Sequence, residues 1–153
     1  MEEITLTITN KVGLHARPAS LFVQEASKYQ SEITVSKGEE SGDAKSILDL
    51  LTLGMAGLHP IQPAAMDIGE VKAKYGGRVC LLGNIDLDYT LTQGTPEEVD
   101  REVKERIAVA GGGGGYIITS ANSLPNYCKT ENVWAMSRAI RKYGTYPLDP
   151  HLR

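Results

Sequence analysis

The sequence is poor in cysteine, in aromatic residues and in long apolar runs. It has 2 cysteines among 153 residues, outside any Cys-x-x-Cys or Cys/His cluster, so we expect neither a disulfide scaffold nor a zinc site. No window reaches the roughly 18 apolar residues of a membrane-spanning helix. The first ten residues lack the basic and apolar regions of a signal peptide. The sequence therefore predicts a cytoplasmic protein that does not enter a membrane.

The charge of the chain is mild. Its formal net charge is -3 at pH 7, and 41% of its residues are hydrophobic, as in an ordinary globular protein. No stretch carries the dense row of Lys and Arg by which a protein neutralises the phosphates of DNA or RNA. We therefore expect no nucleic-acid partner.

Residues 1–55 have the pattern of a small sheet with helices on one face. The segment "ITLTI" at residues 4–8 alternates apolar residues with threonine, which predicts a half-buried antiparallel strand. Apolar residues recur at helical spacing over residues 19–26 and predict a helix. The stretch "SEITVSKGEESGDAK" predicts two short strands joined by a turn.

The stretch "KSILDLLTLGM" predicts a second helix, so the elements of residues 1–55 follow the order β-α-β-β-α. Ser46 is predicted to cap a helix, with Asp49 at the third helical position, where a carboxylate favours the helix dipole. The helix is short and carries four large apolar side chains, Ile47, Leu48, Leu50 and Leu51. These are too many for it to bury completely, so we expect some of them to remain exposed.

After residue 55 the pattern becomes that of a parallel sheet. Short apolar runs, "GLHPI", "RVCLLGNI" and "GYIITSA", are each followed by a segment of helical spacing. The helices are expected at residues 64–75, 96–110 and 131–143. Thr95, Pro96 and Glu98 form a helix-start signal, and glycines at 76, 111 and 144 mark the three ends. The prediction is an α+β protein with domains at residues 1–55 and 56–153, the second holding three βα units.

The segment "GLHARPAS" carries the most informative chemistry. His15 is predicted to stand at the start of the first helix, where unpaired backbone N–H groups favour anions. Arg17 adds a guanidinium suited to phosphoryl oxygens. A neutral imidazole can attack a phosphoryl donor. The alternative from spacing alone is that His15 is merely a polar loop residue.

Residues 1–55, with "NKVGLHARPASLFVQEASKYQSEITVSKG" and "AKSILDLLTLGM", resemble the HPr phosphocarrier family of the bacterial sugar phosphotransferase system. The resemblance implies that Enzyme I phosphorylates His15, that Arg17 contacts the phosphoryl group, and that IIA components accept the phosphoryl group from His15. It also implies that HPr kinase/phosphorylase phosphorylates Ser46. A role as helix cap would explain a serine at this position without any kinase. The partner-docking surface would be formed by Ile47, Leu48 and Leu51.

Residues 57–148 resemble the C-terminal part of the uroporphyrinogen decarboxylase superfamily, through "GNID", "GTPEEV", "GGYI" and "ENVWAM". Those enzymes are (βα)8 barrels, and their relatives include corrinoid-linked methyltransferases. Only three βα units fit here, so a complete decarboxylase site is not expected. A barrel places its chemistry at strand ends, here His59, Asn84, Asp86, Asp88, Ser120 and Asn122.

Metal and cofactor sites are not expected in the second half. In the methyltransferase relatives, zinc is bound by His-x-Cys and a distant Cys, whereas His59 precedes Pro60 and Cys128 lies beyond the expected place. The run "GGGGG" at residues 111–115 follows a helix C-terminus, which is the wrong polarity for a phosphate loop. We read it as a helix end and a flexible connection.

The first 55 residues lack the last strand and helix of the phosphocarrier sheet. "GLHPI" and the helix after it could fill that vacancy, although Pro60 argues against a central strand. Exposed strand edges could also be covered in a homo-oligomer.

Three functions stay open. The leading one is a phosphocarrier acting through His15. The second is a barrel-derived enzyme fragment, and the third is a recombined or engineered chimera without native activity.

Overall fold

The computed structural model describes residues 3–8, 14, 16–54 and 56–152. The chain divides into two compact units, Met1–Ala56 and Gly57–Arg153. Among the helices that the structure describes, none combines the length and apolar character needed to cross a membrane.

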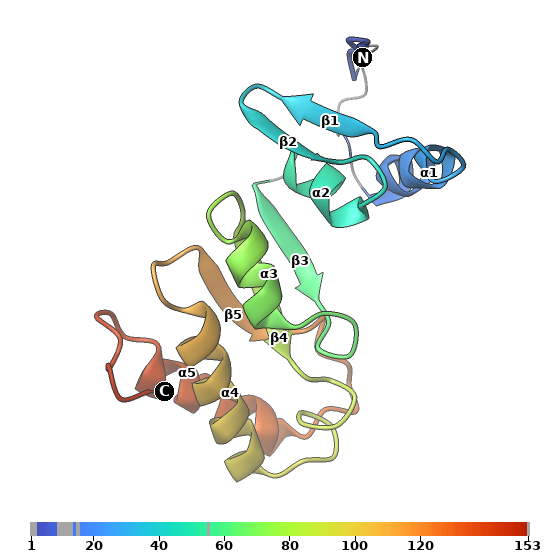
Figure 1. Ribbon diagram of the computed structural model, residues 1–153. Helices are drawn as coiled ribbons and strands as arrows, with labels where there is room; N and C mark the ends of the chain where they lie inside the picture. Colours follow the sequence, from blue (N-terminus) through green and yellow to red (C-terminus); the bar gives the residue numbers. More distant parts are fainter. Residues whose placement is uncertain (1–2, 9–13, 15, 55, 153) are drawn as a thin grey trace. The chain divides into compact units, whose positions relative to one another are not determined.

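Among its described residues, the first unit has two helices and a β-hairpin, which can be followed in Figure 1. In chain order these are α1 (Ala16–Ala26), β1 (Thr34–Lys37), β2 (Glu40–Asp43) and α2 (Ile47–Thr52). The two strands are antiparallel, and Lys37 pairs with Glu40 across a two-residue loop. Gly38 occupies the first loop position with φ of 62°, a backbone angle that glycine adopts without steric cost.

The core of the first unit lies between its two helices. Ala19 of α1 packs with Leu50 and Leu51 of α2, and the partly buried Leu14 and Val23 lie against them. The expectation that Leu51 is exposed was wrong, because Leu51 is only 8% exposed. A helical pattern alone does not say which side chains a second helix will cover, and α1 covers Leu51 here.

The strand predicted at residues 4–8 is wrong. The structure assigns no strand there, and Ile4, Leu6 and Ile8 are 80%, 69% and 56% exposed. A strand is stable only when a neighbour pairs its backbone groups and covers its apolar face. The next strand along the chain after α2 pairs within the second unit, so it does not complete the first sheet, contrary to the idea that "GLHPI" fills the vacancy.

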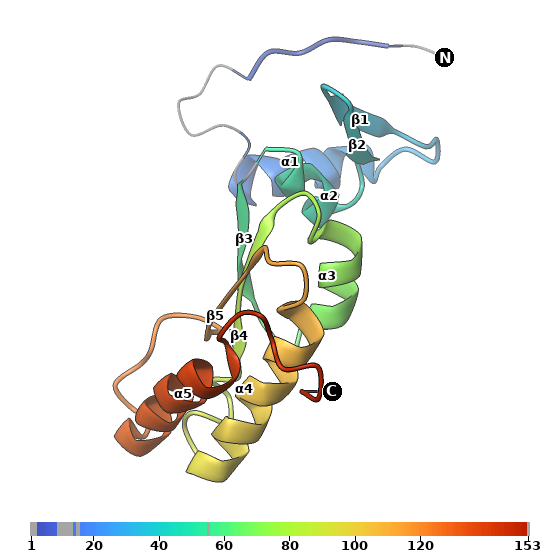
Figure 2. The same cartoon turned by 90° about the vertical axis from the view of Figure 1, so that its left-hand side faces the viewer.

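The second unit is a three-stranded parallel sheet with helices. Its elements are β3 (Gly57–Ile61), α3 (Ile68–Tyr75), β4 (Cys80–Ile85), α4 (Pro96–Ala110), β5 (Tyr116–Ser120) and α5 (Thr130–Tyr143). The strand order is β3-β4-β5, which places Pro60 on an edge strand where its missing N–H is tolerated. Helices α3 and α4 lie along one face of the sheet and α5 packs beside α4 (Figure 2). The predicted α+β class is confirmed.

Local signals start and stop these helices. Asp67 accepts the Glu70 N–H at 2.9 Å and begins α3 at residue 68, four residues later than predicted. Thr95 and Glu98 form the predicted capping box of α4, and α4 has its predicted bounds. An apolar cluster lies between α4, α5 and the end of β4: Ile85, Leu91, Val99, Val103, Ile107, Ala135, Ala139 and Leu152.

Candidate functional site

The candidate phosphoryl site lies at the start of α1. The helix begins at Ala16, and Ala19 anchors its first turn in the core. On the other side of His15 in the sequence, Leu14 packs against the same core. His15 itself lies outside the described residues, so its role remains a prediction.

The first turn of α1 has the features of an anion site. Its first backbone N–H groups have no partner within the helix, and Pro18 removes only an N–H that would have been unpaired. Arg17 is exposed, and within the described ranges no ion pair engages its guanidinium. This arrangement can hold a phosphoryl group between backbone donors and a permanent positive charge.

Ser46 is the N-cap of α2, as predicted. Its Oγ accepts the Asp49 N–H at 3.2 Å, and its hydroxyl donates to Asp49 Oδ1 at 2.9 Å. Its regulatory modification remains a prediction. Ile47 is 38% exposed and Leu48 is half-buried, whereas the buried Leu51 cannot contribute to an exposed docking surface.

The strand-end residues of the second unit do not form one polar cluster among the residues that the structure describes. Some are exposed, and others make hydrogen bonds within their own loops. His59 lies within β3 and is exposed, and Asn122 is exposed as well. The Ser120 hydroxyl donates to the Asn122 carbonyl at 2.6 Å. In the part of the chain that the structure describes, no three His, Cys, Asp or Glu side chains group as a metal site would require. Cys80 and Cys128 are free thiols.

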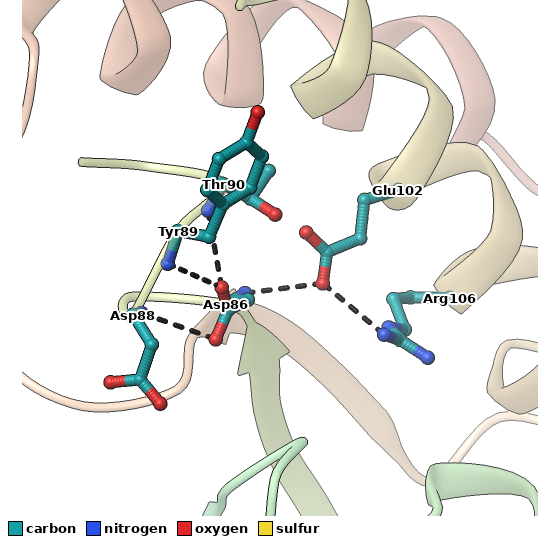
Figure 3. Close-up of polar contacts among 6 residues, drawn as sticks. All are labelled: Asp86, Asp88, Tyr89, Thr90, Glu102 and Arg106. Carbon is teal, nitrogen blue, oxygen red and sulfur yellow. Dashed lines mark hydrogen bonds and ion pairs between the residues drawn. The ribbon is translucent and has the colours of Figure 1, made fainter. Parts of the chain in front are cut away.

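Asp86 organises the turn that follows β4 (Figure 3). Its carboxylate accepts the backbone N–H groups of Asp88, Tyr89 and Thr90 at 3.2, 2.7 and 3.1 Å. The Glu102 carboxylate in turn accepts the Asp86 N–H at 3.1 Å and a guanidinium N–H of Arg106 at 3.3 Å. All three donors to the Asp86 carboxylate belong to its own loop, so Asp86 fixes the conformation of that loop.

The pKa of Asp86 reflects this environment. Burial by itself raises the pKa of the carboxyl, but the three backbone N–H bonds and the nearby Arg106 charge outweigh it and hold the pKa below its ordinary value of 3.8. A group with a depressed pKa stabilises the fold above its unfolded pKa, and that stability is lost as the pH falls through the folded pKa.

We therefore expect acid to weaken the second unit through Asp86. The free energy of unfolding of the wild type should fall more steeply than that of Asp86→Asn between about pH 5 and about pH 2, because the amide does not titrate. Urea unfolding at a series of pH values measures this. Parallel pH profiles for the two proteins would contradict the assignment.

The same loop is held from its other side by the start of α5. Asn132 is 0% exposed, and its Nδ2 donates to the carbonyls of Thr90 and Gly94 at 3.1 and 3.0 Å. Lys129 Nζ donates to the carbonyls of Gln93 and Gly94 at 2.7 and 2.9 Å. Sequence reasoning missed Asn132, because nothing in a helical pattern marks one amide as facing a loop distant in the sequence.

Two strand residues of the second unit have buried polar atoms. Asn84 is 0% exposed, and neither polar atom of its amide has a hydrogen-bond partner among the described residues. The Tyr116 hydroxyl lies near the Asn84 backbone, and burial raises its pKa. Asn84 therefore lies inside the sheet layer and does not reach the open end of the strand as the barrel analogy predicted.

Two protein families match this chain. The family described as "PTS HPr component phosphorylation site" matches residues 2–73, and the family described as "Uroporphyrinogen decarboxylase (URO-D)" matches residues 41–143. The two matches share residues 41–73, and the boundary between the two units falls inside that stretch.

Several similar proteins are named as HPr or as HPr-like. The phosphocarrier protein HPr of Mycoplasma capricolum is 46% identical over 55 residues, which are 36% of this chain and 62% of the relative. HPr of Mycoplasma genitalium is 36% identical over 85 residues, which are 55% of this chain and 97% of the relative. The HPr-like protein Crh of Halalkalibacterium halodurans is 46% identical over 55 residues, or 36% of this chain and 66% of the relative.

The chain thus spans less than two thirds of the Mycoplasma capricolum and Halalkalibacterium halodurans relatives. The Mycoplasma genitalium relative is spanned almost completely. With its two family matches, the chain belongs to the HPr family through its N-terminal part and to the uroporphyrinogen decarboxylase family through its C-terminal part.

Proposed function

We propose that this chain is a phosphoryl carrier of the phosphoenolpyruvate-dependent sugar phosphotransferase system. It accepts a phosphoryl group on His15 from Enzyme I and passes it to IIA components in the cytoplasm. One observation carries the proposal. Helix α1 begins at the residue after His15, with the exposed Arg17 in its first turn and Leu14 packed into the core on the other side.

The chemistry follows from these groups. An imidazole with an ordinary pKa of about 6.5 is mostly neutral at cytoplasmic pH, so one ring nitrogen is free to attack phosphorus. A nitrogen–phosphorus bond forms as the bond from phosphorus to the donor breaks. The positive end of the α1 dipole and the Arg17 guanidinium stabilise the anionic product. Transfer to a IIA component reverses the same steps.

The test uses the purified chain with Enzyme I and phosphoenolpyruvate labelled in its phosphoryl group. We expect acid-labile label on the wild type and none on His15→Ala. His59→Ala is the matched control, because it removes an exposed histidine of the second unit and should leave the label unchanged. An unlabelled but folded wild type, or full label on His15→Ala, would exclude the carrier function.

Ser46 is proposed as the regulatory site of this carrier, modified by HPr kinase/phosphorylase. Ile47 and Leu48, which follow it on α2, remain the proposed docking residues for partners. Since Leu51 is buried, we leave it out of that surface.

A second candidate function comes from the second unit. Parallel sheets are normally covered on both faces, yet Ile117 of β5 is 51% exposed. The exposure of Ile117 supports the interpretation that the second unit is a fragment of a decarboxylase-like or methyltransferase-like barrel. Such a fragment needs complementary strands to complete its sheet. Porphyrinogen turnover or corrinoid binding by the full chain would favour it. A cooperative melt with neither activity and no phosphoryl transfer would favour a chimera without native activity.

A further inference from the structure

Strand β5 leaves one edge of the sheet in the second unit open. It is an edge strand, and β4 is its only neighbour among the described strands (Figure 1). On the β4 side, the Gly115 carbonyl accepts the Leu81 N–H at 2.9 Å, and the Ala121 N–H donates to the Ile85 carbonyl at 2.8 Å. The backbone groups of successive strand residues point to alternate sides. The odd-numbered residues of β5 therefore bond to β4, and the even-numbered residues point away from it.

The outward-facing backbone groups of β5 belong to Tyr116, Ile118 and Ser120. Among the described residues, only the Ser120 carbonyl of this set has a hydrogen-bond donor, the Thr119 hydroxyl at 2.7 Å. A row of unpaired N–H and C=O groups at a sheet edge is a template on which another strand can add. The side chain of Ile117, in the same strand, is 51% exposed. Both the backbone and an apolar side chain of β5 are thus left open to a partner.

The two edges of this sheet differ in their protection. Sheet edges in natural proteins are commonly protected by charged residues, prolines or irregular pairing. On β3, Pro60 has no N–H, and the register with β4 shifts between Leu58 and Ile61. The pairing of β5 with β4 is regular, and the sequence has no charged residue between Arg106 and Lys129. Of these two edges, β5 is therefore the one that accepts another strand.

The same strand in a second copy of this chain fits the open edge. Two identical antiparallel strands are related by a two-fold axis, and an axis at Ile118 places the two Ile118 residues opposite each other. Each Ile118 N–H then donates to the carbonyl of the other Ile118. Tyr116 of one copy bonds in the same way to Ser120 of the other. The exposed Ile117 side chain comes to lie beside Thr119 of the second copy, which covers part of its surface.

The absence of charge favours this occupant. A two-fold axis brings each edge residue close to its own counterpart, so a charged edge strand would repel itself. Since no charge occurs between Arg106 and Lys129, the pairing of two β5 strands meets no such repulsion. A strand that carries charges would find no opposite charge on β5.

We propose that two copies of this chain associate through antiparallel pairing of their β5 strands, which joins two three-stranded sheets into one continuous sheet. The inference goes beyond phosphoryl transfer and does not depend on His15. Only one strand of each copy forms the contact, so the interface is small and the dimer dissociates on dilution.

Two measurements on the full chain test this pairing. In sedimentation equilibrium, the average mass should rise from the 16.6 kDa of one chain toward twice that value between micromolar and millimolar concentration. In hydrogen exchange, the Ile118 amide should exchange at least about tenfold more slowly at the millimolar concentration. The amides of Ile117 and Thr119 should change far less, because they face β4 in both states.

Ile117→Lys is the variant that should separate the two copies. Lysine protects the edges of natural sheets, and the two-fold axis places the two introduced ammonium groups on the same face of the joined sheet. We expect this variant to keep the mass of one chain at every concentration. Val109→Lys is the matched control, because Val109 lies on α4 and is 52% exposed, and this variant should still dimerise.

A wild type that stays monomeric at millimolar concentration would overturn the inference. If the Ile118 amide were protected in that monomer, a segment of the same chain would occupy the edge instead. A dimer whose Ile118 amide exchanges equally fast at both concentrations would place the interface elsewhere, and so would equal effects of Ile117→Lys and Val109→Lys. If Ile117→Lys does not fold, the concentration dependence of the Ile118 amide in the wild type decides alone.

Discussion

Replacing Asn132 with aspartate is expected to lower the free energy of unfolding of the second unit by about 3–5 kcal/mol, the cost of an uncompensated buried charge. The substitution keeps the size of the side chain and exchanges the two amide donors for a carboxylate. In the native protein Asn132 is 0% exposed and donates to the carbonyls of Thr90 and Gly94. A carboxylate in that place would face carbonyl oxygens that can offer it no proton.

Chemical unfolding at pH 7, followed by far-ultraviolet circular dichroism, measures the loss. Asn122→Asp makes the same chemical change at an exposed residue. The Asn122 Oδ1 accepts the Ser123 N–H at 2.8 Å, and a carboxylate preserves that bond, so the control should stay within about 0.5 kcal/mol of the wild type. Equal losses in the two variants would show that Asn132 does not hold the loop.

Leu91→Ala is the second substitution with a large expected effect. Leu91 lies in the loop after β4, is 0% exposed, and packs in one cluster with Ile85, Val99 and Val103. Truncating this buried side chain leaves a cavity, so we expect a loss of about 2–5 kcal/mol in the free energy of unfolding of the second unit.

The midpoint of chemical unfolding should fall without a change in the denaturant slope, because the unfolded surface is nearly the same. Val109→Ala is the comparison, since Val109 is 52% exposed on α4 and should cost less than about 1 kcal/mol. A Leu91→Ala protein as stable as Val109→Ala would mean that the loop does not pack as described.

Local signals in the sequence were sufficient to predict several helix boundaries. The capping residues Ser46, Thr95 and Glu98 make the contacts expected of them, and α4 has its predicted bounds. These predictions succeed because a cap and its partner lie within three residues and interact whatever the rest of the chain does.

Predictions that depend on distant partners did less well. The alternation at residues 4–8 is a correct description of the side chains, but no described strand pairs with this segment. Leu51 is buried because α1 covers it, and Asn132 is buried because the loop after β4 folds onto it. Both facts depend on tertiary packing, which the periodicity of a single segment does not contain.

For the candidate site, the sequence predicted the residue types and their order. The structure adds that Arg17 is exposed in the first turn of a helix starting at Ala16. At the end of β4 the structure instead shows a carboxylate with a structural role. The Asp86 carboxylate accepts three backbone N–H groups of its own loop. Chemical type and position predicted roles for both groups. The hydrogen-bond partners show that Asp86 is structural, whereas the role of Arg17 remains a prediction.

The close approach of Gly42 to Asp49 also restricts which residues the hairpin accepts at position 42. A Cβ added there would lie 2.8 Å from the Asp49 Cβ, so any side chain would have to push β2 and α2 apart. Shortening residue 49 removes that overlap, so Gly42→Ala should cost less stability in an Asp49→Gly background than in the wild type.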